Sequence, residues 1–144
     1  MPKLKGVMET LAPHMARWAV LCIDLQYSSP LPRPRILVEL IGRAEKLETL
    51  RLTFVTDDST DDFPPTNGEF DIPVLSALEM GGMHFRQSYV EPSPHVVLPA
   101  SLRDICLSDY GAHHPPFPLV DLFKSLVTGN RLCGVKLTTC TART

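Results

Sequence analysis

The sequence predicts an α/β fold in which five short parallel strands form a solenoid, with helices and irregular returns on its convex side. An apolar pattern, with apolar residues at its first, fourth and sixth positions, occurs five times along the 144 residues. The five segments begin at residues 18, 47, 75, 102 and 132, so their starts are 29, 28, 27 and 30 residues apart. This spacing is typical of leucine-rich repeats, whose units hold roughly 20–29 residues, with one of the four gaps just beyond that range. We therefore expect a short leucine-rich-repeat solenoid that forms a single domain over residues 1–144.

Each segment has the alternation of a short strand with one buried face. Its fourth and sixth residues are apolar and are separated by a polar or small residue, which gives a period of two. Because one such strand cannot bury its apolar face alone, neighbouring strands have to stack into a parallel sheet. We expect strands near residues 18–25, 47–54, 75–81, 102–108 and 132–138. Their buried row is expected to hold Leu21, Ile23, Leu50, Leu52, Leu78, Met80, Ile105, Leu107, Val135 and Leu137.

The segments between the strands are expected to differ from one another. Residues 1–16 are expected to form an N-terminal capping helix over the first strand. Residues 33–46 and 117–127 have the apolar spacing of amphipathic helices, with prolines at their starts, where proline is tolerated. Residues 57–69 are acidic without a helical period, and residues 86–99 contain three prolines, so both are expected to be irregular. No helix is expected to start after Gly81-Gly82.

The overall composition argues against several classes of protein. A net charge of −2 is unlike that of a general nucleic-acid-binding protein, which carries a basic surplus on one face. No run of 18 apolar residues occurs, so no membrane span is expected. The N-terminus lacks the apolar core of a signal peptide, and the four cysteines (Cys22, Cys106, Cys133 and Cys140) then indicate reduced thiols. These features predict a cytoplasmic or nuclear protein.

The sequence contains no common catalytic motif, so we expect no enzymatic activity and no cofactor. It has neither a Gly-x-Ser-x-Gly nucleophile turn nor a phosphate-binding glycine loop. The histidines His84, His95, His113 and His114 and the four cysteines lack the paired spacing of a zinc site, so no metal ligand is assigned. The acidic run of residues 57–62 lacks the ligand order of a calcium loop. We expect a solubilising loop there, with phosphorylation of Ser59 or Thr60 as the alternative.

Five stretches carry a resemblance to a known family: residues 17–25 (RWAVLCIDL), 28–32 (SSPLP), 36–52, 70–78 (FDIPVLSAL) and 98–107 (LPASLRDICL). They resemble the degenerate leucine-rich-repeat region of F-box proteins, of the kind expanded in mushroom-forming fungi, and the resemblance covers nearly the whole chain. It implies a repeat fold that recruits substrates to a ubiquitin ligase. The F-box itself, which opens with a Leu-Pro-x-Glu-Ile-like stretch, is absent. Residues 1–16 are too few to hold it, so we expect it in a longer parent chain.

The ninth position of each repeat departs from that family. Asparagine is usual there, whereas this chain has Gln26, Val55, Met83, Tyr110 and Cys140. We therefore expect an irregular curvature. Each end of the array also needs a cap. Trp18 is expected to be a buried end cap, whereas the C-terminal tail offers none. Either the chain is cut from a longer protein or a partner covers that edge.

The concave face of the sheet is the expected binding surface, because curvature gathers the exposed strand side chains into one broad face. Arg51 and Glu79 are expected to be lateral neighbours that pair across two strands. The alternative is a solvated sheet face without a ligand. The candidate partner-binding residues are Asp24, Thr49, Arg51, Thr53, Glu79, Asp104, Ser108 and Lys136.

The function expected from these observations is that of a protein–protein interaction module. Through the resemblance, it is the substrate-recognition part of an F-box-type ubiquitin-ligase subunit, and a ligase adaptor would bind the F-box of the parent chain. The alternative is a freestanding leucine-rich-repeat scaffold or binding protein unrelated to ubiquitin, and an enzyme is a distant third. The protein partner is not identified by the sequence.

Overall fold

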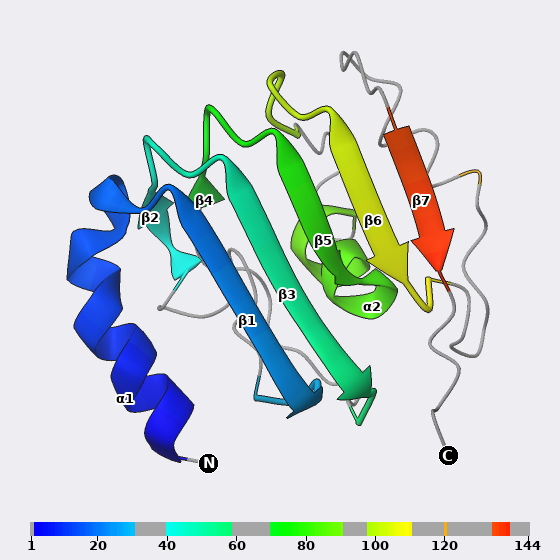
Figure 1. The fold of residues 1–144 in the computed structure, drawn as a ribbon, viewed down its shortest axis with the longest axis horizontal. Coiled ribbons are helices and arrows are strands. Elements are labelled where there is room, and N and C mark those ends of the chain that lie inside the picture. The colour runs from blue at the N-terminus through cyan, green and yellow to red at the C-terminus, as the bar shows by residue number, and fades with distance from the viewer. Residues whose placement is uncertain are drawn as a thin grey trace.

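The protein has a mixed α/β fold built on a parallel sheet (Figure 1). The computed structural model describes residues 2–30, 40–58, 70–90, 98–110, 120 and 134–138. Within these residues, five strands form one sheet in the order β1-β3-β5-β6-β7, and two α-helices accompany it. The strands of this sheet are β1 (Val20–Tyr27), β3 (Thr49–Thr56), β5 (Ala77–Gly81), β6 (Asp104–Ser108) and β7 (Gly134–Thr138).

The register of the sheet confirms the predicted alignment of the five segments. All four strand pairs are parallel. Leu21 lies opposite Leu50, Leu50 opposite Leu78, Leu78 opposite Ile105, and Ile105 opposite Val135. The first four strands each begin two residues after the first residue of their pattern, because that first residue belongs to the turn that precedes the strand.

The turns before the strands repeat as regularly as the strands do. The backbone amides of Trp18, Leu47, Leu75 and Leu102 each donate to the carbonyl three residues earlier, at 3.0–3.3 Å. Leu47, Leu75 and Leu102 are completely buried, whereas Trp18 is half-buried and packs against the edge of the core. The expected end cap at Trp18 is therefore a partly covered one.

Burial of the predicted apolar row is confirmed for the three middle strands and is wrong for the last one. Leu50, Leu52 and Met80 are completely buried, and their row continues through β6. On β7, however, Val135 is 42 % exposed and Leu137 is 43 % exposed. On β1 the apolar residues of the row are half-buried. An end strand has a neighbour in the described sheet on one side only, which accounts for the difference.

The N-terminal helix is confirmed. Helix α1 (Pro2–Leu11) continues into a 3-10 turn, Ala12–Arg17, and stands beside the β1 edge of the sheet (Figure 1). Met8 and Met15 are buried, and Leu4 packs against the core, so the apolar side of the helix covers that end. No helix within the described residues is long and apolar enough to span a membrane.

The predicted helix over residues 33–46 is wrong for its last part. Residues 42–43 form the short strand β2 (Gly42–Arg43), which pairs in parallel with β4 (Phe70–Asp71) in a second, two-stranded sheet. Gly42 has φ 131°, a conformation that favours glycine, and the amide of Ala44 donates to the carbonyl of Asp71 at 2.8 Å. Strand pairing of residues 42–43 with residues 70–71 therefore outweighs the helical spacing of the apolar residues in this part of the sequence. Residues 33–39 lie outside the described part of the chain.

The segment after β5 is helical, so two expectations are wrong. A helix does start after Gly81-Gly82, and residues 86–90, the first part of the segment expected to be irregular, are helical as well. Helix α2 (Gly82–Phe85) is followed by a π-helical turn, Arg86–Val90, and Figure 1 shows α2 behind β5 and β6. Phe85 and Tyr89 are buried, with ring centroids 5.3 Å apart. Residues 82–90 are helical because this conformation packs the two rings beneath the sheet. The predicted helix at residues 117–127 lies outside the described residues except for Val120, which is helical.

Candidate binding face of the parallel sheet

One face of the sheet carries side chains that alternate with the buried row. We call it the open face. Because strand side chains point to alternate sides, all eight predicted partner-binding residues lie on this face. Gly81, which the same alternation would place there, is instead buried, since the chain turns into α2 at that point. The open face consists of Val20, Cys22, Asp24, Gln26, Thr49, Arg51, Thr53, Val55, Ala77, Glu79, Asp104, Cys106, Ser108, Gly134, Lys136 and Thr138.

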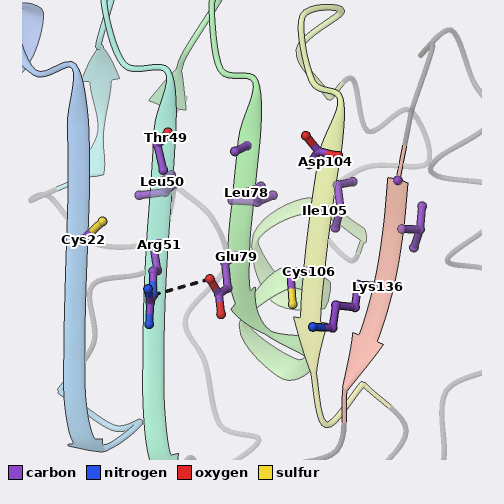
Figure 2. Close-up of a pocket in the computed structure, with 13 residues that line it drawn as sticks. Cys22, Thr49, Leu50, Arg51, Leu78, Glu79, Asp104, Ile105, Cys106 and Lys136 are labelled. Carbon is purple, nitrogen blue, oxygen red and sulfur yellow. Dashed lines mark ion pairs between the residues drawn. The ribbon is translucent and has the colours of Figure 1, made fainter.

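A hollow of about 510 Å³ lies on the open face, and residues from all five strands line it (Figure 2). We call it the face hollow. Asp24, Thr53 and Ser108 lie on the same face but do not line the hollow. The predicted residues that the structure brings together around it are Thr49, Arg51, Glu79, Asp104 and Lys136.

Small side chains and two thiols were missing from the predicted set. Ala77 and Gly134 lie on either side of Asp104 in one row of the register, and their small size leaves room above the sheet. Cys22 and Cys106 also line the hollow as free thiols. The strand alternation already placed these four residues on the exposed face. The predicted register of the strands therefore already indicated that these residues lie next to the charged residues of the same face.

Three charged residues of the open face form a connected group. Arg51 lies between two carboxylates, with Nη2 3.5 Å from Asp24 Oδ1 and Nε 3.4 Å from Glu79 Oε2. Thr53 Oγ1 donates a hydrogen bond to the same Asp24 oxygen. The predicted Arg51–Glu79 pair is thus confirmed, and Figure 2 shows it as a dashed line. Since these side chains are roughly half exposed, the pairs contribute about 1 kcal/mol or less and mainly hold Arg51 in place.

Asp104 and Lys136 are the other two charged residues of the face hollow. Within the described part of the chain, neither side chain makes a hydrogen bond or an ion pair. The Asp104 carboxylate lies against Gly134, where a Cβ would be 3.0 Å from Oδ1. Figure 2 shows Lys136 reaching from β7 over β6 toward Cys106. The hollow therefore presents one carboxylate and one ammonium group that no described residue pairs with.

A second hollow of about 650 Å³ opens at the edge of the sheet where the strands begin. We call it the edge hollow. Its lining is formed by the turns before β3, β5 and β6, and Asp104 is the residue it shares with the face hollow. Ser76 and Ser101 donate their hydroxyl groups to backbone carbonyls there, so these hydroxyls are already used. The lining residues are Glu48, Val74, Ser76, Ala100, Ser101, Arg103 and Asp104.

The start of the acidic run is bonded to the end of β1 rather than simply solvated, which corrects the expectation for residues 57 and 58. The buried Ser28 hydroxyl donates to Asp57 Oδ1 at 2.5 Å and to Asp58 Oδ1 at 3.1 Å. The backbone amide of Ser29 donates to Asp58 Oδ1 at 2.8 Å. This amide bond is the main reason that the pKa of Asp58 lies below its ordinary value of 3.8. Ser59 and Thr60 lie outside the described residues.

The described residues contain no group of three or more His, Cys, Asp or Glu side chains that could hold a metal ion. His84 is buried beneath the sheet, 5.7 Å from the ring of Phe54, while His113 and His114 lie outside the described residues.

Neither a protein-family model, nor a curated protein, nor a solved structure matches this chain.

Proposed function

We propose that this protein is a recognition module that binds a protein partner through its open face. The observation that carries the proposal is the face hollow, because side chains from all five strands converge on one depression. Protein interfaces use about 800 Å² of each partner's surface, which a sheet face can supply and a small cleft cannot. The strands fix the backbone positions of the charged residues before a partner binds, so the ordering cost of binding is confined to their side chains.

We further propose that the fold is a leucine-rich-repeat solenoid and that the open face is its concave side. Two repeated features support this. The strands are in register at intervals of 27 to 30 residues, and the same hydrogen-bonded turn precedes four of the five strands. Such stacked repeats generally use the sheet face for binding. The ninth repeat position supports a variant of the usual repeat, since Met83 and Tyr110 bury apolar groups where asparagine is usual.

The wider role that we propose is substrate recognition for a ubiquitin ligase, on the basis of the resemblance to F-box leucine-rich-repeat regions. In that role a ligase adaptor binds an F-box that precedes the repeats in a parent chain. The alternative is a freestanding scaffold unrelated to ubiquitin. The reading frame upstream of Met1 separates the two, because an F-box-like helical stretch there favours the ligase role and its lack favours the scaffold.

Partner capture tests the proposed function directly. We expect wild-type protein, immobilised and exposed to a cell extract, to retain specific proteins that the Arg51→Glu/Lys136→Glu variant loses. Because Arg51→Glu removes two exposed ion pairs and adds a third carboxylate beside Asp24 and Glu79, the melting temperature should fall by no more than about 6 °C. The matched control is Lys46→Glu, an exposed charge reversal in the turn before β3. Unchanged capture by the double variant would show that the open face is not the binding site.

A further inference from the structure

We infer that the occupant of the face hollow is an extended segment of a protein partner that carries a basic and an acidic side chain two residues apart. The basic side chain binds Asp104, and the acidic side chain binds Lys136. This inference rests on the proposed function and specifies its ligand. It starts from the charges in the hollow, since Arg51 is already paired with Glu79 and with Asp24, while Asp104 and Lys136 have no partner among the described residues.

The spacing of the two charges sets the spacing in the ligand. Asp104 lies opposite Gly134, and Lys136 is two residues further along β7, so the two are diagonal neighbours. Because neighbouring strands lie about 4.8 Å apart and a strand rises roughly 3.3 Å per residue, the backbone positions of these diagonal neighbours are roughly 8 Å apart. An extended chain rises roughly 3.3 Å per residue and turns alternate side chains to the same side, so residues two apart span a similar distance. A basic and an acidic residue separated by one position therefore match the pair.

The adjoining hollows favour an extended segment over a small zwitterion. Asp104 lines both the face hollow and the edge hollow, so the two hollows adjoin. An extended occupant can therefore contact the face of the sheet and the turns before the strands at the same time. The small side chain of Ala77 leaves the Asp104 carboxylate uncovered on the β5 side, and Gly134, against which the carboxylate lies, has no side chain to cover it on the β7 side. A single amino acid would fill a small part of this path.

The test uses the full 144-residue protein and a library of random 12-residue peptides displayed on phage. Wild-type protein is expected to enrich peptides with Lys or Arg and Asp or Glu separated by one residue. With Lys136→Glu, the two positions of the hollow outside the Arg51–Glu79 pair, 104 and 136, are both negative, and the enriched peptides should exchange their acidic residue for a second basic one. Because like charges in contact are strongly unfavourable, acidic residues at that position should fall by roughly tenfold or more. Asp104→Lys should have the opposite effect and select two acidic residues, whereas Lys46→Glu should select the wild-type pattern.

A blocking variant distinguishes failure of this inference from failure of the proposed function. Ala77→Trp places a large ring in the face hollow and is expected to abolish enrichment, and Thr49→Trp serves the same purpose should the first variant lose its cooperative melting transition. If Ala77→Trp abolishes enrichment but the peptide charges do not follow the variants, the open face binds peptides and the charge pairing is wrong. If no peptide is enriched in a way that depends on the hollow, both the inference and the proposed function are overturned.

Discussion

Truncation of Leu52 is the sharpest test of the core that underlies the open face. Leu52 is completely buried and lies between Ile23 on β1 and Met80 on β5. Replacing it with alanine removes buried methyl groups and leaves a cavity that its neighbours on both strands cannot fill. Leucine-to-alanine substitutions at such sites cost about 2–5 kcal/mol. For a chain of this size, that corresponds to a fall in melting temperature of roughly 6–20 °C.

The matched control is the same substitution at the end of the sheet. Leu137 is 43 % exposed, and complete burial of a leucine contributes about 1.5–3 kcal/mol, so Leu137→Ala should cost about 1 kcal/mol or less. Urea unfolding followed by circular dichroism measures both variants, with an unchanged dependence on urea showing that the unfolding reaction is the same. A cost below about 0.5 kcal/mol for Leu52→Ala would place this residue outside the core. A cost at Leu137 equal to that at Leu52 would refute the exposed end strand.

Two further predictions concern close backbone packing and acid stability. A Cβ on Gly82 would lie 2.2 Å from the Cα of Tyr110, so Gly82→Ala should cost about 1–3 kcal/mol, whereas Gly6→Ala in open space within α1 should stabilise by about 0.5–1 kcal/mol. Equal melting temperatures for the two variants would contradict this packing. The pKa of Asp58 lies below its ordinary value of 3.8, so its stabilising effect is present above that pH and is lost as the pH falls through the folded-state pKa. Asp58→Asn should therefore flatten the decline in the free energy of unfolding between about pH 5 and pH 2, and parallel profiles for the two proteins would rule out this role.

Much of the sheet could be predicted because its signal is local and repeated. The pairs Leu21–Leu50 and Leu50–Leu78 follow from the apolar pattern alone, since parallel strands that bury one face must align their apolar residues. The Arg51–Glu79 pair follows from the same register. The returns were harder to predict, because their local periods compete with contacts that the sequence does not display. Residues 42–43 form a strand rather than the end of a helix because a partner strand lies alongside them.

The candidate site shows the same division. Alternation along each strand was sufficient to place Asp104 and Lys136 on the open face, because strand side chains point to opposite sides in turn. The apolar pattern could not show that these two residues have no partner among the described residues, because pairing depends on which side chains reach one another in space. The edge hollow was likewise not predicted. It depends on how the turns before β3, β5 and β6 stack, and Asp104 connects it to the face hollow only in the folded sheet.

By itself, the sequence determined the five strands, their order and the face that each residue occupies, because a period of two and a repeat of 27 to 30 residues allow one parallel register. Only the tertiary structure decided how deeply each strand is buried, where the chain becomes helical after Gly81, and which charges remain unpaired. These properties depend on distant neighbours. Val135 and Leu137 match the apolar pattern of the buried row but lie at the end of the described sheet, where packing on one side leaves them exposed.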